Sequence, residues 1–172
     1  MRLFTTLLAG SLAVVAGPLL AADAVPEIKR DAGAPQAVGA AHTLRTIPEA
    51  CARLEGVFTG DTAQPYKYAV VRTDPQCQPR ARFVDYAKAQ PTEAKGWKLN
   101  DVIRAPSAAC PSQQAVVRVW RLPADNKPLL DGQGSARIYL QDAKEAAAAG
   151  KKLPAVTMYA AEMKVEGKGC EG

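Results

Sequence analysis

Histidine is almost absent from this sequence, and that absence weakens the case for several kinds of catalysis. The only histidine among the 172 residues is His42, which lies in a segment that we expect to be flexible. A serine or cysteine nucleophile depends on a base that is held in a fixed orientation. The sequence therefore disfavours a hydrolase that uses histidine as its base, and it favours a protein that is not an enzyme.

Metal and nucleotide motifs are missing as well. None of the four cysteines belongs to a C-x-x-C pair, so neither a redox motif nor a zinc ribbon is supported. The chain has no D-x-D-x-D-G loop for calcium, and Gly132 and Gly134 are too close together for a nucleotide-binding fingerprint. We therefore predict no catalytic, metal-binding or cofactor-binding residue, and no cofactor.

Acidic side chains offer one other route to catalysis, because glycosidases work with pairs of carboxylates. Asp85, Glu93 and Asp101 are the acids nearest to the expected strands, and each has an arginine or lysine close to it in sequence. No spacing among them singles out a pair, and we interpret all three as solvated surface charges. A cell-wall-acting hydrolase with unidentified carboxylates stays open as the alternative function.

The first 24 residues have the layout of a cleavable signal peptide. Arg2 supplies the positive start, residues 3–20 form an uncharged apolar run, and Ala-Asp-Ala at 22–24 offers the small side chains that a signal peptidase accepts. A membrane anchor is disfavoured, because the run is short for a span and a glycine–proline pair at 17–18 interrupts it. We predict cleavage after Ala24, no transmembrane segment after cleavage, and a bacterial periplasmic or secreted protein.

The cysteines agree with export. There are four of them, Cys51, Cys77, Cys110 and Cys170, and in an oxidising compartment they are expected to form two disulfides. Three pairings are open to four cysteines. We favour Cys51–Cys77, because a strand that begins near Cys51 and pairs antiparallel with residues 66–73 would bring the two together. Cys110–Cys170 then joins a loop to the C-terminal tail.

The remaining chain is the right length for one domain. Residues 25–45 consist mainly of alanine, glycine, proline and glutamine, without apolar periodicity, and are expected to form a flexible tether. Residues 46–172 are expected to form a single disulfide-bonded β-rich domain. A short helical turn is expected from Thr46 towards Leu54, and the alternative is a strand that already begins at Arg53.

Several short runs have strand-like composition, and turn signals separate them. Residues 66–73 and 81–85 look like a hairpin whose tip carries Cys77, and residues 115–122 look like a central strand, because both faces are largely apolar. Further strands are expected at residues 97–104, 136–140 and 155–160, with 165 as an alternative end of the last, and a short helix at residues 142–149. The fold is therefore expected to be mostly β, or α+β with an antiparallel sheet: a small sandwich or barrel-like domain with short helices at its periphery.

One candidate ligand-binding stripe stands out. Tyr66, Tyr68 and Arg72 share one face of an expected strand, and Arg118 and Trp120 share one face of another. An exposed stripe of this kind would stack on flat groups and hold an anion, but the rings are better interpreted as core residues with arginines at its edge.

The net charge of +5 and the pI of about 9.1 permit an anionic partner, although the bases are scattered along the chain. The sequence favours an exported, non-enzymatic module that binds an envelope protein or an anionic envelope polymer. It disfavours nucleic acid as a partner, because the chain is expected to leave the cytosol. The molecular activity, the identity of the partner and the oligomeric state are not determined by the sequence.

Overall fold

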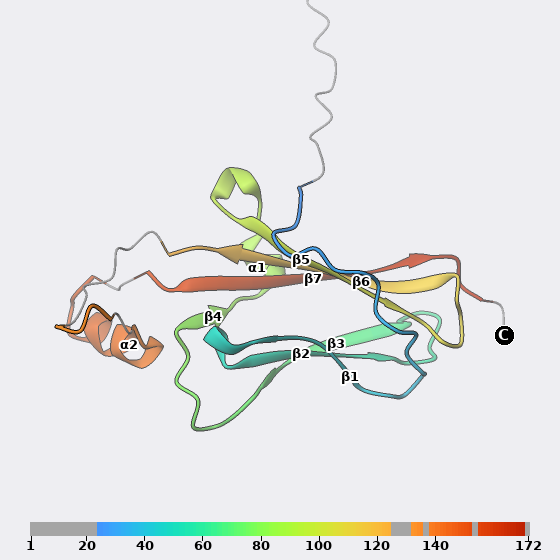
Figure 1. Ribbon diagram of the computed structural model, residues 1–172, viewed down its shortest axis with the longest axis horizontal. Helices are drawn as coiled ribbons and strands as arrows, with labels where there is room; N and C mark the ends of the chain where they lie inside the picture. Colours follow the sequence, from blue (N-terminus) through green and yellow to red (C-terminus); the bar gives the residue numbers. More distant parts are fainter. Residues whose placement is uncertain (1–23, 125–131, 136–137, 153–154, 171–172) are drawn as a thin grey trace, which may run out of the picture.

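The computed structural model describes residues 24–124, 132–135, 138–152 and 155–170, and it places them in two stacked β-sheets (Figure 1). The smaller sheet has the strand order β1-β2-β3, and the larger has the order β4-β7-β6-β5. The strands of the smaller sheet are β1 (His42–Ile47), β2 (Ala52–Phe58) and β3 (Tyr66–Arg72). Those of the larger sheet are β4 (Ala81–Phe83), β5 (Lys98–Pro106), β6 (Gln113–Leu122) and β7 (Thr157–Gly167).

Helices are short and lie outside the two layers. They comprise α1 (Tyr86–Ala89), α2 (Leu140–Ala148) and two 3-10 turns, η1 (Pro48–Ala50) and η2 (Glu93–Lys95). Figure 1 shows α2 at one end of the molecule, beyond the ends of the strands. The predicted class, a small disulfide-bonded β-rich domain with peripheral helices, is confirmed.

The core fills the space between the two sheets. Alternation along β6 directs Ala115, Val117 and Val119 into that space, and all three are completely buried. The facing sheet contributes Leu54 and Phe58 from β2, which are also buried. Because β6 pairs with β5 on one side and β7 on the other, the prediction of a central strand at residues 115–122 is confirmed.

Both disulfides have the pairing that the sequence favoured. Cys51 is bonded to Cys77 and Cys110 to Cys170, with Cα–Cα distances of 5.9 Å and 5.5 Å. Cys51 comes directly before β2, which runs antiparallel to β3 with Ala52 opposite Arg72. That pairing brings Cys51 to the end of β3, where the chain turns towards Cys77.

The expected hairpin of residues 66–73 and 81–85 does not form. β3 pairs only with β2 in the described part of the chain, whereas β4 joins the other sheet and runs parallel to β7. The connection between them is held at its start by Arg72, whose guanidinium donates hydrogen bonds to the carbonyl oxygens of Asp74, Pro75 and Cys77. A proline-rich linker of this kind carries the chain from one layer to the other instead of folding back on β3.

Residues 25–45 are attached to the domain and do not form the flexible tether that their composition suggested. Residues 27–36 run parallel along β5, with backbone hydrogen bonds that include Ile28 N to the Asn100 oxygen at 2.9 Å and Gly33 N to the Arg104 oxygen at 2.8 Å. β1 then begins at His42. The free edge of β5 offers unpaired backbone groups, and an extended segment satisfies them without apolar side chains of its own.

Two smaller expectations also need correction. The helical turn from Thr46 is a single 3-10 turn that ends at Ala50, and the alternative strand is the one that forms, as β2. The strand expected at residues 136–140 is not seen among described residues: Leu140 begins α2, and residues 136 and 137 lie outside the description. In the described residues no helix is both long and apolar enough to cross a membrane.

Candidate functional site

The residues of the candidate stripe are separated by the fold. Tyr66 is completely buried between the sheets, and its ring packs edge-on against Phe58 with centroids 4.8 Å apart. Its hydroxyl lies 2.8 Å from Nε2 of His42, so the only histidine is part of the packed structure rather than of a mobile arm. Burial raises the pKa of the Tyr66 phenol well above its ordinary value.

Arg118 and Trp120 lie on the opposite side of the other sheet. They alternate along β6 with Val117 and Val119, which face the core, so both point to the outer face. Arg118 is within 3.5 Å of Glu166 of β7, and the indole N–H of Trp120 is buried without a hydrogen-bond partner among described residues. The five residues Tyr66, Tyr68, Arg72, Arg118 and Trp120 therefore do not form one surface.

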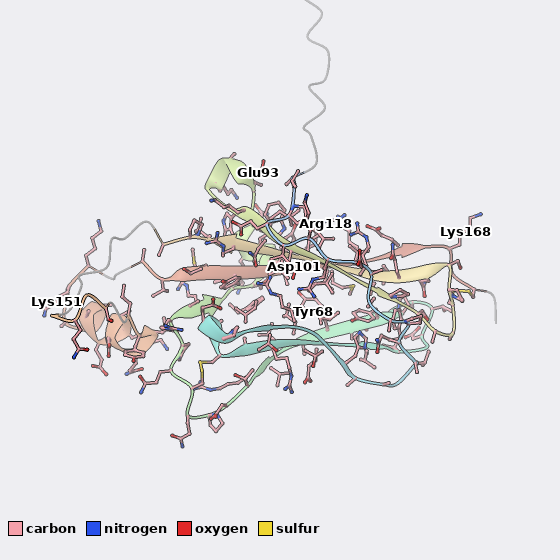
Figure 2. All side chains as sticks on the ribbon, in the orientation of Figure 1. Tyr68, Glu93, Asp101, Arg118, Lys151 and Lys168 are labelled. Atoms are coloured by element: carbon pink, nitrogen blue, oxygen red, sulfur yellow. A yellow bond between two sulfur atoms is a disulfide. The ribbon has the colours of Figure 1, made fainter. Side chains whose placement is uncertain are left out.

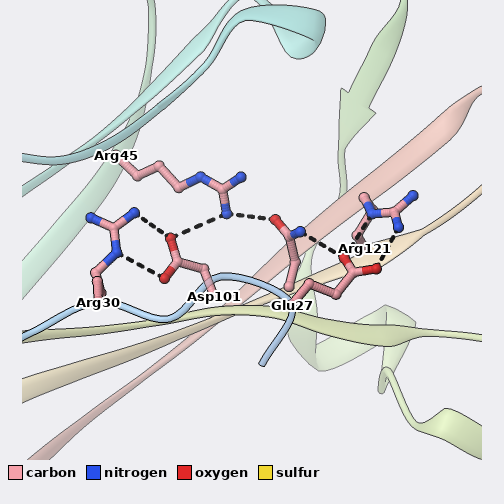
Figure 3. Close-up of polar contacts among 6 residues, drawn as sticks. Glu27, Arg30, Arg45, Asp101 and Arg121 are labelled. Atoms are coloured by element: carbon pink, nitrogen blue, oxygen red, sulfur yellow. Dashed lines mark hydrogen bonds and ion pairs between the residues drawn. The ribbon is translucent and has the colours of Figure 1, made fainter. Parts of the chain in front are cut away.

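Asp101 is not the solvated surface charge that the sequence suggested. It is 0% exposed, and its carboxylate accepts two hydrogen bonds from Arg30, at 2.9 Å from Nε and 2.6 Å from Nη2 (Figure 3). A second arginine, Arg45 of β1, lies 3.3 Å from the same carboxylate. The register of β5 places Asp101 opposite Val119, on the core face, so a buried carboxylate here requires charged partners.

The polar contacts continue from Asp101 along the N-terminal segment (Figure 3). Asn100 accepts a hydrogen bond from Arg45 at 2.5 Å and donates one to Glu27 at 2.8 Å, and Glu27 forms an ion pair with Arg121 at 2.6 Å. Hydrogen bonding from Arg121 lowers the pKa of Glu27 below its ordinary value, against a smaller opposing effect of burial. Every charged group in this cluster has a partner of opposite charge, so its role is to fasten residues 27–30 to β5 and β6.

A largely apolar groove lies on the described surface between the edge of β3 and the edge of β7. We call it the β3–β7 groove. It has a volume of about 730 Å³ and is lined by residues 68, 70, 83–87 and 161–163. Aromatic and aliphatic side chains dominate the lining, among them Tyr68, Val70, Phe83 and Met163. Val70 is 45% exposed, a large value for a valine in a strand.

A hydrogen bond crosses the groove from one sheet to the other. The Tyr68 hydroxyl of β3 donates to the carbonyl oxygen of Ala161 of β7 at 2.8 Å, and Figure 2 shows Tyr68 between the two layers. Burial and, to a smaller extent, the charge of Asp85 raise the pKa of Tyr68 above 10.0. The phenol is therefore protonated at neutral pH and serves as a hydrogen-bond donor.

The charge of the groove is opposite to that of the whole chain. Among the described residues, Asp85 and Glu162 are the only charged ones that line it, whereas the chain carries a net charge of +5. The Asp85 carboxylate accepts a hydrogen bond from the backbone of Ala87 at 2.9 Å and so caps α1. Burial first, then the charge of Glu162 and a hydrogen bond to it, raises the pKa of Tyr86. The groove is thus an apolar surface with two anionic groups.

β7, which forms one wall of the groove, has a free edge beyond β4 in the described part of the chain. β4 pairs with β7 only at residues 157–159, and the Val84 N–H then donates to the Tyr159 oxygen at 2.8 Å. Asp85 starts α1 directly afterwards, and the chain leaves the edge of the sheet. In the region that the structure describes, no strand pairs with β7 on this side beyond Tyr159.

The free edge has a defined set of polar groups. In an antiparallel ladder, every second residue directs its N–H and C=O towards the same neighbouring strand. The backbone oxygen of Tyr159 faces β4, and the register with β6 is uninterrupted. The backbone N–H and C=O groups of Ala161, Met163 and Val165 therefore face the same, open side. The Ala161 oxygen is taken by Tyr68, and the groups of Met163 and Val165 face outwards.

Reasoning from the sequence identified only one side chain of this groove as a binding candidate, Tyr68, and treated Asp85 as an isolated surface acid. The lining combines β3, β4 and α1 with β7, which is distant from them in sequence, and the shortness of β4 that opens the groove was not visible in the composition. Among the described residues, no group of three or more histidine, cysteine, aspartate or glutamate side chains is arranged to hold a metal ion.

No protein-family model matches the chain, and neither does any curated protein or solved structure. The residues of the β3–β7 groove are therefore the basis on which a function is inferred.

Proposed function

We propose that this protein is an exported, non-enzymatic module that binds a protein partner through the β3–β7 groove. The observation that carries the proposal is the combination of an apolar lining with a free strand edge in the same place. Folded proteins usually cover or blunt such an edge, as this one does at β5 with residues 27–36. Main-chain groups that face outwards beside exposed apolar side chains are typical of a surface that recognises polypeptide.

Charge favours one of the two partners that the sequence left open. The groove is lined by Asp85 and Glu162 and by no lysine or arginine in the part of the chain that the structure describes. An anionic polymer would meet two like charges there, whereas a protein segment that carries a base would meet opposite ones. The arginines that suggested an anionic ligand lie elsewhere: Arg118 is on the outer face of the larger sheet, and Arg72 holds the loop after β3.

Export is part of the proposal. Two disulfides are typical of an oxidising compartment outside the cytosol. Together with the signal-like residues 1–24, they support a bacterial periplasmic or secreted protein whose partner lies in the cell envelope. Detection of a mature chain that begins at Val25 in the periplasmic or extracellular fraction is the expected result, and an uncut cytosolic chain with free thiols would contradict it.

A capture experiment with two matched variants tests the binding function. Val70 and Val38 are almost equally exposed, at 45% and 46%, but only Val70 lines the groove. We expect the immobilised mature protein to retain a specific envelope protein, Val70→Lys to lose it, and Val38→Lys to keep it. Retention that is unaffected by Val70→Lys would show that the groove is not the binding surface. Degradation of purified cell-wall polymer by the protein would support the hydrolase instead.

A further inference from the structure

Building on the proposed function, we infer that the β3–β7 groove takes an extended segment of its partner as an added strand on β7, one that alternates apolar residues with at least one lysine or arginine. Three observations support it: the outward main-chain groups of β7, the two chemically different sides of that edge, and the segment that already occupies the opposite edge of the same sheet.

The main chain of β7 provides the hydrogen-bonding frame. Met163 and Val165 direct their N–H and C=O groups to the open side, and both lie in an uninterrupted part of the β6–β7 ladder. The alternation leaves two complete donor–acceptor sets in register for an incoming chain. A lipid or a glycan has no matching row of groups, whereas an extended polypeptide of about five residues does.

The side chains beside this edge predict an alternating pattern in the bound segment. A strand added to β7 would direct every second side chain towards the core side, where Tyr68, Val70 and Phe83 line the groove. The intervening side chains would lie on the outer face, the side of Glu162, which is opposite Arg118 in register. Apolar residues fit the first set of positions and a base fits the second.

Two acids are available to a base in the bound segment. Glu162 is shared with Lys164, whose Nζ lies 2.7 Å from it and which is itself largely exposed. Asp85 forms no ion pair with any described residue, and its contact is the N–H of Ala87. A lysine or arginine from the partner would therefore meet a carboxylate that forms no ion pair with a described residue.

The opposite edge of the same sheet already uses this chemistry. Residues 27–36 lie along β5 as an extended segment, joined to it by backbone hydrogen bonds. Within that segment Arg30 supplies the base for a carboxylate of the sheet, Asp101. The larger sheet is thus covered on its β5 side by an extended chain with a basic residue, and the β7 side beyond Tyr159 is the edge left open.

A second copy of the protein is a weaker occupant. Pairing of two β7 edges would bring the Asp85 and Glu162 carboxylates of both copies to one interface, and like charges across paired strands are unfavourable. Concentration-dependent dimerisation that Val70→Lys abolishes would nevertheless identify a second copy as the occupant and overturn the proposal.

Selection from a displayed library of random twelve-residue peptides tests the inference directly. The mature protein is the target, and we expect the selected peptides to share alternating apolar residues and at least one base. Binding of the synthesised consensus peptide should slow amide hydrogen exchange at Met163 and Val165, with no comparable change at Gly33 or Gln36 on the opposite edge. Methylation of the set of alternate backbone nitrogens that faces β7 should abolish binding.

Two variants separate the side-chain contributions. Asp85→Asn keeps a side chain that caps α1 but removes the charge. We expect it to weaken the affinity for the consensus peptide about tenfold, and high salt should reduce this effect. Val70→Lys should weaken the affinity at least as much, while Val38→Lys should leave the affinity unchanged. Peptides that lack bases, or that leave the Met163 and Val165 amides unprotected, would overturn the inference. If no peptide is selected while envelope capture still depends on Val70, strand addition is wrong and the binding function stands.

Discussion

The hydroxyl of Tyr68 and the carbonyl oxygen of Ala161 are 2.8 Å apart, although 93 residues separate the two positions in the chain. This hydrogen bond joins β3 of one sheet to the open edge of β7 in the other. It fixes the distance between the two walls of the groove at one point and leaves the edge beyond Ala161 accessible. This hydrogen bond therefore marks one end of the open edge of β7, where an incoming strand would begin.

Replacement of Tyr68 by phenylalanine tests that bond. The ring stays and the donor is lost, so we expect the free energy of unfolding to fall by about 1 kcal/mol, the usual net contribution of one hydrogen bond. Urea unfolding of the two proteins at neutral pH measures the difference. An unchanged midpoint would show that the bond contributes nothing to the attachment of the two sheets.

Removal of the buried charge of Asp101 is expected to cost more. Asparagine has nearly the same shape but cannot neutralise Arg30 and Arg45, so Asp101→Asn should lower the free energy of unfolding by about 3 kcal/mol. Glu166→Gln is the matched control, because that carboxylate is 41% exposed and its pair with Arg118 should contribute less than about 0.5 kcal/mol. Equal effects in urea unfolding would contradict the interpretation of Asp101 as a buried anchor.

The Glu27–Arg121 pair predicts a dependence of stability on pH. Hydrogen bonding to Arg121 lowers the pKa of folded Glu27, so its contribution is present above the ordinary value of 4.5 and is lost as the pH falls through the lowered pKa. We expect Glu27→Gln to be less stable than the unmodified protein at neutral pH, by less than about 1 kcal/mol because the pair is partly exposed. The difference should shrink in unfolding measurements made progressively below pH 4.5. A constant difference across that range would argue against the ion pair.

Gly56 is expected to tolerate no side chain. A Cβ at this position of β2 would overlap the hydroxyl of Tyr66, the group that contacts His42. Gly56→Ala should therefore displace a completely buried ring and reduce the free energy of unfolding by about 2 kcal/mol, a usual cost of overpacking. Gly169→Ala is the control, because nothing lies within 4 Å of a Cβ there. Similar thermal unfolding of both variants would contradict the close contact.

Features that depend on local residue chemistry were predicted correctly from the sequence. Apolar residues on both faces predicted the central strand at 115–122, and the even cysteine count predicted two disulfides, whose favoured pairing is the one that forms. The antiparallel approach of a strand near Cys51 to residues 66–73 was also correct, because a single turn between neighbouring elements decides it. These features depend on residues that are close in sequence or on covalent bonds.

The errors concern long-range partners. Residues 25–45 lack apolar periodicity, yet they are ordered, because the edge of β5 and the carboxylate of Asp101 supply partners more than sixty positions away in the chain. For the same reason His42 appeared mobile and Asp101 appeared solvated. Composition describes what a segment can bury by itself, and it does not register backbone hydrogen bonds or ion pairs that another segment offers.

The sequence by itself therefore determined the class of the domain, the expectation of two disulfides and the positions of most strands. Only the tertiary structure decided that β4 leaves β3 and joins the other sheet, that it pairs with only three residues of β7, and that the candidate stripe is divided between two surfaces. A strand edge is free when no other segment of the folded chain pairs with it. No pattern within a single segment encodes it, because it depends on where every other segment has gone.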